Sequence, residues 1–272
     1  MSEKIKTVAI IGMGYMGKII ASQISPFDYN IRIYDEISDK LELLARKIKR
    51  KKKTKGVNEQ VTFHKTLNES IVDVDLIIEC IPENLELKRE VFSQIDKVAP
   101  SHAIIATNSS SIPVSRIEKA VQRKDKVLNM HFYHPAVPMV EIMKGTKTSD
   151  ETFDYGKKFI ESIGLTPILI KKESFGFVCN RMWHAARKEA LDMWANDNAD
   201  IETIDKAWKI FTRMDFGPFE LMDSIGLDTV YNVHMEYFKE TGDIKKKPPE
   251  KLKEMIDRGE LGMKTKKGFY SY

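Results

Sequence analysis

The apolar residues in the first part of the chain occur in short runs rich in β-branched side chains. These runs are VAIIG, NIRIYDE, VDLIIECIP, AIIATNSS, KVLNMHFYHP and PMVEIMKG. Segments with apolar residues at helical spacing, such as ENLELKREVFSQIDKVA and YGKKFIESIG, stand between several of them. Short β-branched runs are typical of buried strands. The alternation predicts a parallel, helix-flanked sheet over roughly the first 170 residues.

The strand-like runs stop after TPILIKKESFG. The segments NRMWHAARKEALDMWAND, IETIDKAWKIFTRM and TVYNVHMEYFKETG carry apolar or aromatic residues at helical spacing. Asp200 is placed to cap the start of the second of these segments. We therefore expect two domains, an α/β domain over residues 1–171 and an all-helical C-terminal domain over residues 172–272.

A glycine-rich turn follows the first predicted strand and opens a predicted helix. Gly12, Gly14 and Gly17 form the pattern G-x-G-x-x-G. In that context the first glycine permits a tight turn, the second lets a pyrophosphate approach the backbone, and the third lets the helix lie close to the sheet. Tyr15 and Met16, between the second and third glycines, are expected at the same cofactor site. The pattern predicts a dinucleotide-binding domain.

An acidic residue follows the second predicted strand at the position that such a domain requires. Asp35 would accept hydrogen bonds from the adenosine ribose hydroxyls and repel the 2′-phosphate of NADP. NAD is therefore the expected cofactor. The competing interpretation is a glycine turn that serves packing alone, followed by a surface aspartate.

The charge of the chain is nearly balanced, with 44 basic and 40 acidic residues and a formal net charge of +4. This is far from the asymmetry of a dedicated nucleic-acid binder. One segment, RKIKRKKKTKG, nevertheless holds eight basic residues and no acidic one. A solvated helix end, an anionic substrate site and a nucleic-acid patch are the three interpretations. Nucleic acid would need nearby aromatic platforms or a groove-reading helix, and neither is visible, so we expect no nucleic-acid partner.

Cysteine usage and hydropathy indicate the compartment. Cys80 and Cys179 are far apart and lie within apolar runs, which indicates reduced, buried thiols rather than a disulfide framework. The N-terminal apolar run is too short for a signal peptide, and no apolar stretch is long enough to cross a membrane. We expect a cytoplasmic protein with no membrane partner.

The stretch MHFYHPAVPMVE sets His131, His134 and Glu141 close together in sequence. It admits three interpretations, namely a metal site, an acid-base pair, or a strand edge that happens to carry histidines. The familiar zinc-binding pair of histidines is presented by one helix, whereas this run is not helical. We therefore expect no metal.

Several motifs resemble those of the L-3-hydroxyacyl-CoA dehydrogenase family, and in the same order along the chain. They are IIECIPENLELKREVF, ATNSSS, MHFYHP, PMVEIMKG, GFVCNR, DFGPFELMDSIGLD and the terminal KTKKGFYSY. The resemblance implies a Rossmann-type N-terminal domain and a helical C-terminal domain that usually mediates dimerisation, so a homodimer is expected. It also implies reversible, NAD-dependent oxidation of an L-3-hydroxyacyl-CoA to the 3-ketoacyl-CoA.

The resemblance assigns catalytic roles to four residues. His131 matches the general base, which also acts as the acid in the reverse direction, and Glu141 matches its partner. Ser110 and Asn180 match polar residues that contact the substrate. An imidazole suits proton transfer near neutrality, and a carboxylate on its other nitrogen would fix the tautomer. Without the resemblance, Asn180 could equally be a helix N-cap and Ser110 part of a serine-rich turn.

The resemblance also assigns residues to the nicotinamide half of the cofactor. Glu83 and Lys88 match such residues, and Ser110 and His134 are expected beside them. His134 stands where the family usually has an asparagine. An acid in the first turn of a helix, favoured by the helix dipole, would account for Glu83 without a cofactor.

Two departures from the family pattern bear on the expected activity. The family usually places the histidine and glutamate slightly further apart, whereas nine residues separate His131 from Glu141 here. Relatives also often carry a longer helical arm over the coenzyme, of which the basic run is what remains. We expect Lys51, Lys52 and Lys53 to meet the coenzyme's phosphates as point charges.

Two other functions compete with acyl-CoA oxidation. ECIPENLELK looks as much like dehydrogenases of free hydroxy acids, such as gulonate or carnitine dehydrogenases, as like the acyl-CoA enzymes. A protein that binds NAD without chemistry is the second alternative, but it would have little reason to keep the four catalytic candidates together.

Overall fold

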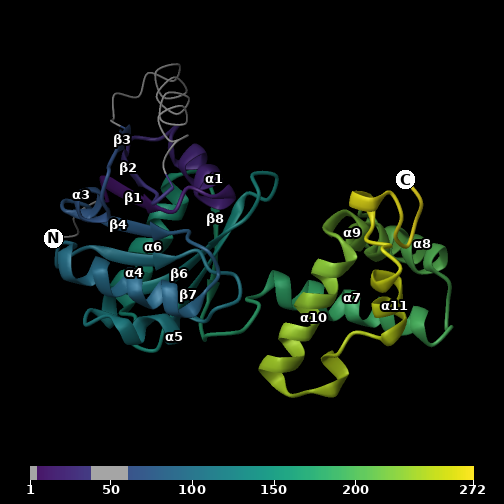
Figure 1. Cartoon of the computed structure of the whole chain (residues 1–272). Coiled ribbons are helices and arrows are strands. Elements are labelled where there is room, and N and C mark those ends of the chain that lie inside the picture. Colours follow the sequence, from purple (N-terminus) through teal and green to yellow (C-terminus); the bar gives the residue numbers. More distant parts are fainter. Residues whose placement is uncertain (1–4, 38–60) are drawn as a thin grey trace. The chain divides into compact units, whose positions relative to one another are not determined.

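The computed structural model describes residues 5–37 and 61–272 of the chain and divides into two compact units, Met1–Val178 and Cys179–Tyr272 (Figure 1). The first unit is α/β and the second is helical, as the sequence pattern predicted. The sequence pattern predicted the boundary between the two domains after residue 171, just beyond the last strand. The residues that follow this strand belong with the first unit, since Phe177 packs in one apolar cluster with Met143 and Ile170.

In its described residues, the first unit is built on an eight-stranded sheet in the order β3-β2-β1-β4-β5-β6-β7-β8. The strands are β1 Thr7–Ile11, β2 Asn30–Tyr34, β3 Val61–Phe63, β4 Leu76–Glu79, β5 Ile104–Thr107, β6 Val127–Phe132, β7 Met139–Lys144 and β8 Thr166–Ile170. Neighbouring strands from β3 to β6 are parallel, but β7 is antiparallel to β6 and β8 follows the direction of β7. The expectation of a parallel sheet is therefore confirmed from β3 to β6 and was wrong at this edge. The residues between β6 and β7 are too few for a crossover, so the chain turns back as a hairpin.

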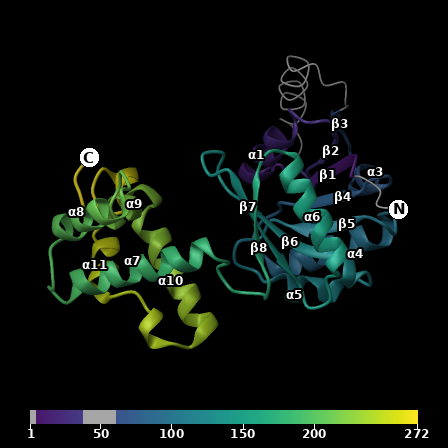
Figure 2. The ribbon, with the colours of Figure 1, turned by 180° about the vertical axis from the view of Figure 1, so that it is seen from behind.

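Helices cover both faces of this sheet (Figures 1 and 2). They are α1 Tyr15–Ile24, α3 Leu67–Ile71, α4 Leu85–Val98, α5 Val114–Ile117 and α6 Asp150–Ser162, with the 3-10 turns η1 Glu118–Ala120 and η2 Lys124–Lys126. α1 and α6 contribute to one apolar cluster, whereas α3, α4 and α5 contribute to another. Alternate residues of β1 enter opposite clusters, Val8 and Ile10 the first and Ala9 and Ile11 the second.

The second unit packs its helices around Leu191, Phe219 and Leu227. Its elements are α7 Cys179–Ala195, α8 Ile201–Thr212, α9 Pro218–Ile225, α10 Leu227–Thr241, η3 Ile244–Lys246, α11 Glu250–Asp257 and η4 Met263–Thr265. The predicted cap is confirmed, because the Asp200 carboxylate accepts a hydrogen bond from the Thr203 N–H at the start of α8. Within the parts of the chain that are described, no helix has the length and apolar character to cross a membrane.

Two buried aspartates connect α8 and α9 to the C-terminal segment of the second unit. Asp205 of α8 accepts hydrogen bonds from the N–H of Phe219 at the start of α9 and from the Tyr270 hydroxyl. Asp223 of α9 accepts from the N–H groups of Phe269 and Tyr270. The buried carboxylates thus fix the terminal GFYSY segment, and the hydrogen bonds that they accept offset the free-energy cost of burying them.

A pair of buried histidines joins α7 to α10. His184 and His234 are 1% and 0% exposed, and their ring centroids lie 4.3 Å apart. Tyr237 stacks on His184 at 3.7 Å. Burial, reinforced by the positive charge of Arg187, lowers the pKa of His184 to about 3 and that of His234 to about 2. Both imidazoles are therefore neutral in the folded unit near neutral pH.

We expect these histidines to make the second unit sensitive to acid. Once unfolded, each regains a pKa of about 6.5 and takes up a proton that the folded form rejects. Their contribution to the free energy of unfolding is therefore intact above about pH 6.5 and is lost as pH falls toward about 3, by about 1.4 kcal/mol per histidine between about pH 7.5 and about pH 5.5. Urea unfolding followed by tryptophan fluorescence measures this, because Trp183, Trp194 and Trp208 all lie in the second unit.

The comparison is between about pH 7.5 and about pH 5.5 in wild type and in His184→Phe. Between the two conditions, the free energy of unfolding of the variant should fall by about 1.4 kcal/mol less than that of wild type. His102→Gln, which alters a half-exposed histidine of the first unit, serves as the control. Equal losses of unfolding free energy in wild type and His184→Phe would contradict the lowered pKa of His184.

Candidate active site

The glycine turn lies between the end of β1 and the start of α1, and the chain itself explains two of its three glycines. Gly12 has a φ of +93°, and a Cβ there would lie 2.8 Å from the backbone carbonyl of Cys80. A Cβ on Gly17 would lie 2.0 Å from the Gly12 carbonyl oxygen. Among the described residues, a Cβ on Gly14 would meet nothing within 4 Å. Packing against those residues therefore gives no reason for the absence of a side chain at Gly14.

Asp35 follows β2 and is hydrogen-bonded to the backbone of this turn. Its carboxylate accepts hydrogen bonds from the N–H of Met13 at 2.5 Å and of Ile37 at 2.8 Å. Among the described residues, no side chain caps the first N–H groups of α1. A carboxylate and a helix N-terminus that none of those side chains caps thus face the same turn.

A pocket of about 800 Å³ opens at the carboxyl ends of the parallel strands. Eight of the predicted cofactor residues line it, namely Gly12, Gly14, Tyr15, Met16, Asp35, Glu83, Lys88 and Ser110. Gly17 and His134 are not among its lining residues. Its size and its position at the strand ends are those of a nucleotide site in an α/β sheet.

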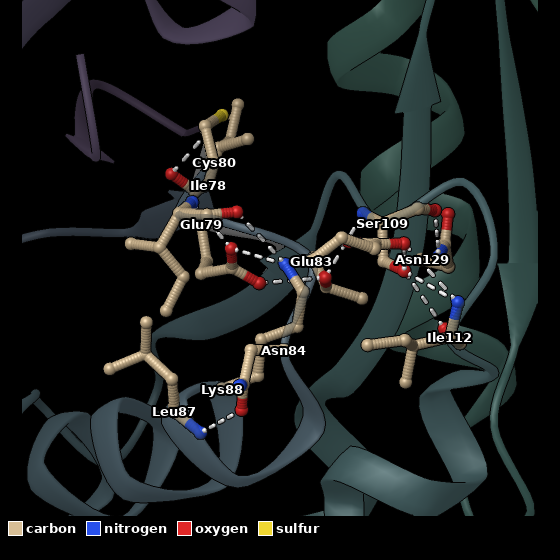
Figure 3. A network of polar contacts seen from close by, with 12 residues as sticks. Ile78, Glu79, Cys80, Glu83, Asn84, Leu87, Lys88, Ser109, Ile112 and Asn129 are labelled. Atoms are coloured by element: carbon tan, nitrogen blue, oxygen red, sulfur yellow. Dashed lines mark hydrogen bonds and ion pairs between the residues drawn. The ribbon is translucent and has the colours of Figure 1, made fainter. Parts of the chain in front are cut away.

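A buried ion pair joins Glu79 at the end of β4 to Lys88 of α4 (Figure 3). Lys88 is among the residues that line the pocket. The Lys88 ammonium is 2.7 Å from Glu79 Oε1, and the two side chains are 1% and 0% exposed. Glu79 also accepts hydrogen bonds from the Thr107 hydroxyl at 2.8 Å and the Ile81 N–H at 2.7 Å. Burial raises the pKa of Glu79, and the Lys88 ammonium and these hydrogen bonds oppose that rise. The ammonium of Lys88 is thereby engaged inside the protein.

Glu83 connects this pair to the loop after β5. Its carboxylate lies 3.3 Å from Lys88 Nζ and accepts hydrogen bonds from the hydroxyls of Ser109 and Ser111 at 2.5 and 2.8 Å. Although burial opposes it, the charge of Lys88 and these hydrogen bonds hold the pKa of Glu83 below its usual range. The helix-dipole interpretation of Glu83 was wrong, because Asn84 caps α4 and Glu83 precedes it. Glu83 is an ionised acceptor at the pocket wall.

His131 and Glu141 lie directly opposite each other in the antiparallel register of β6 and β7. His131 Nδ1 is 3.2 Å from Glu141 Oε2, and Glu141 is fully buried. The hairpin geometry explains how residues separated by a short segment meet, since directly opposite side chains in such a pair share one face. With Nδ1 donating to the carboxylate, Nε2 is the acceptor nitrogen.

The other predicted site residues occupy different surroundings. Ser110 is exposed in the loop after β5. His134 is exposed in the β6–β7 turn, where its Nδ1 accepts a hydrogen bond from the Ala136 N–H at 3.3 Å. Asn180 lies inside the first turn of α7, since that helix begins at Cys179, and its place in the site stays a prediction. Lys51, Lys52 and Lys53 lie outside the described residues. No cluster of three or more side chains able to hold a metal ion occurs within residues 5–37 and 61–272.

Sequence reasoning missed three side chains of this region. Glu79 ends an apolar strand, and a carboxylate within such a run was the available signal. Ser109, rather than its neighbour Ser110, hydrogen-bonds Glu83, and nothing in a row of serines distinguishes the two. The Tyr133 hydroxyl donates to Glu141 Oε2 at 2.7 Å, a contact that depends on how the turn is formed.

The glycine turn after β1, the aspartate after β2 and the pocket at the strand ends define a dinucleotide-binding domain of the Rossmann type. A family model described as 3-hydroxyacyl-CoA dehydrogenase, NAD binding domain, matches residues 7–174, and that of the C-terminal domain matches residues 176–272. The chain therefore belongs to the 3-hydroxyacyl-CoA dehydrogenase family. The predicted family, the NAD cofactor and the class of NAD-dependent dehydrogenase are confirmed.

Relatives match over nearly the full chain. It is 35% identical to a 3-hydroxybutyryl-CoA dehydrogenase of Clostridioides difficile over 279 residues, which cover 97% of this chain and 99% of the relative. It is 32% identical to the mitochondrial hydroxyacyl-coenzyme A dehydrogenase of Homo sapiens, with coverage of 98% and 91%. The crystal structure of (S)-3-hydroxybutyryl-CoA dehydrogenase PaaH1 from Ralstonia eutropha aligns with a TM-score of 0.87 at 31% identity, covering 99% of both chains.

The buried pair of Glu79 and Lys88 leads to a prediction about stability. Lys88→Met leaves the Glu79 carboxylate without its cation in the interior, which should cost about 3–5 kcal/mol. The double variant Glu79→Gln/Lys88→Met leaves no unpaired charge at these two positions and should recover part of that loss. Urea unfolding followed by circular dichroism measures the free energies of unfolding of wild type, Glu79→Gln, Lys88→Met and the double variant.

Lys157→Met is the matched control, because Lys157 and Glu161 form an exposed pair at 3.9 Å in the same unit. It should change stability by less than about 1 kcal/mol. Strictly additive losses from the Glu79 and Lys88 substitutions would contradict a coupled buried pair.

Proposed function

We propose that this protein catalyses the reversible NAD-dependent oxidation of an L-3-hydroxyacyl-CoA to the 3-ketoacyl-CoA, with His131 as general base and Glu141 as the residue that orients it. The observation that carries the proposal is the buried pairing of His131 Nδ1 with Glu141 Oε2 across β6 and β7. A base held by a carboxylate on its second nitrogen is the arrangement that proton transfer from an alcohol requires. The names of the relatives support the substrate class.

The chemistry follows from the state of the imidazole. Neutral His131 accepts the proton of the C3 hydroxyl at Nε2, and Glu141 stabilises the imidazolium that forms. NAD, when bound, supplies the acceptor for the hydride that leaves C3. In the reverse direction His131 donates its proton to the ketone oxygen. Ser110 and Asn180 are proposed to donate hydrogen bonds to that oxygen, as neutral donors do where charge develops.

The residues around the pocket fit a dinucleotide. The open space at Gly14 and the uncapped start of α1 suit a pyrophosphate, and Tyr15 and Met16 lie in the first turn of that helix. Asp35 is proposed to bind the adenosine ribose, which favours NAD over NADP.

Glu83, Ser110 and His134 are proposed for the nicotinamide half of the cofactor. Lys88 is proposed with them, since it lines the pocket and its ammonium lies between Glu79 and Glu83. Gly17 serves the packing of α1 against the turn.

We further propose a cytoplasmic homodimer. Cys80 and Cys179 do not form a disulfide, as expected in a reducing compartment. The second unit exposes Ile210, Phe211, Met214 and Phe216 at and beyond the end of α8, with Phe211 87% exposed. A second copy of the chain would cover such side chains.

The proposed activity is tested by NADH oxidation with a panel of 3-ketoacyl-CoA thioesters of increasing chain length, alongside free hydroxy acids in the oxidation direction. We expect turnover with at least one thioester and a loss of about 10³-fold or more in kcat for His131→Gln, since the base is removed. NADH binding followed by fluorescence should be unchanged in the variant.

His64→Gln is the control, because His64 follows β3 and hydrogen-bonds Thr62. Equal rates in wild type and His131→Gln would overturn the role of His131. Turnover of free hydroxy acids without turnover of any thioester would favour the alternative substrate class, which the comparisons do not favour.

The basic run is proposed to bind the coenzyme's phosphates. Reversal of charge at Lys51, Lys52 and Lys53 to glutamate should raise KM for the thioester by about 10-fold or more at low salt, with little change in kcat. The effect should shrink as salt screens the charges. The same reversal at Lys245, Lys246 and Lys247 is the matched control, and an equal rise in KM there, or none at the first site, would refute the proposal.

A further inference from the structure

A tyrosine hydroxyl shares the oxygen of Glu141 that pairs with His131. Tyr133 donates a hydrogen bond to Glu141 Oε2 at 2.7 Å, whereas His131 Nδ1 lies 3.2 Å from the same atom. We propose that Tyr133 is a positioning residue that fixes Glu141 and limits how strongly this carboxylate stabilises the imidazolium of His131. This inference rests on the proposed function, because it concerns the pH range over which His131 acts as a base.

Glu141 is surrounded by donors. Besides Tyr133 and His131 on Oε2, the Val178 N–H donates to Oε1 at 2.9 Å. The side chain is fully buried, so these hydrogen bonds replace water as the partners of its charge. Each donor draws part of the negative charge toward itself and restricts the carboxylate to one orientation. Tyr133 therefore both orients the acceptor and reduces the charge that it presents to His131.

The ring of His131 is enclosed by aromatic side chains. Tyr133 lies at 4.5 Å between ring centroids, and Phe177 stacks on His131 at 4.8 Å. The half-buried Tyr133 is thus packed against the imidazole as well as bonded to its partner. This packing fixes the phenol, so its hydroxyl remains directed at Glu141.

The protonation of His131 responds to the titratable and charged side chains that face its ring. Of the side chains placed against its ring in the described part of the chain, Glu141 and Tyr133 are titratable and Phe177 is not. On the adjoining strands, Ile168 of β8 lies opposite Glu141, and Thr107 of β5 lies opposite Asn129 of β6. Ile168, Thr107 and Asn129 carry no charge. Besides Glu141 itself, the Tyr133 hydroxyl is therefore the titratable group whose removal tests this pair.

Removal of the hydroxyl has a defined sign. In Tyr133→Phe the ring remains, but Glu141 Oε2 loses a donor and presents more charge to His131. The imidazolium is then more stable, so His131 becomes a base only at higher pH. We expect the acidic limb of the pH profile of kcat/KM to move upward by about 0.5–1 pH unit.

Tyr29→Phe is the matched control. Its hydroxyl forms a hydrogen bond with Ser162 at 2.5 Å in the same unit, so the same single oxygen is removed from a polar contact away from the dyad. Its pH profile should coincide with that of wild type. A profile of Tyr133→Phe that also coincides with wild type, or moves downward, would overturn the proposal, as would an equal upward shift in Tyr29→Phe.

A second readout needs no turnover. The chain has six histidines, so NMR of ring-labelled histidine resolves a small set of signals, and that of His131 is assigned by its loss in His131→Gln. Its titration midpoint should rise in Tyr133→Phe by the same amount as the kinetic limb. An unchanged midpoint would overturn the role of Tyr133 even in an active enzyme. Absence of activity in wild type with every thioester would instead overturn the proposed function, while this titration would still decide the inference.

Discussion

The antiparallel pairing of β6 with β7 is the interaction on which the proposed chemistry depends. Strands β1 to β6 run in one direction, so their carboxyl ends form one edge and the nucleotide pocket opens there. The reversal at β7 returns the chain immediately beside β6 and places Glu141 opposite His131. A buried carboxylate is costly unless it is satisfied, and the hairpin supplies its partners.

A second buried network supports the cofactor side of the same sheet. Glu79 at the end of β4 holds Lys88 of α4, and Lys88 in turn approaches Glu83 (Figure 3). Ser109 after β5 completes the chain of contacts. Three neighbouring elements are therefore connected by ionic and hydrogen bonds. Such a network fixes the pocket wall, which mobile surface side chains would not do.

Much of the fold could be predicted because local chemistry determines it. The glycine turn, the buried strands and the cap at Asp200 follow from residues close in sequence. The direction of β7 could not be deduced from periodicity, because an alternating or apolar run is the same in either orientation. The length of the segment before it was the available signal.

The candidate site was predictable only in part for a similar reason. The resemblance identified His131 and Glu141, and the structure brings them together, although their roles remain proposals. The engagement of Lys88 with Glu79, the choice of Ser109 over Ser110 and the contact of Tyr133 all depend on side-chain directions across different strands. These contacts join residues from separate elements, and propensity and spacing carry no information about them.

The central claim is that His131 and Glu141 act as one unit. The most direct measurement is kcat/KM for a 3-ketoacyl-CoA with NADH in wild type, His131→Gln, Glu141→Gln and the double variant. If the carboxylate acts through the imidazole, the double variant should be no more than about 3-fold slower than His131→Gln alone. Losses that multiply in the double variant would show two independent contributions and would contradict the account.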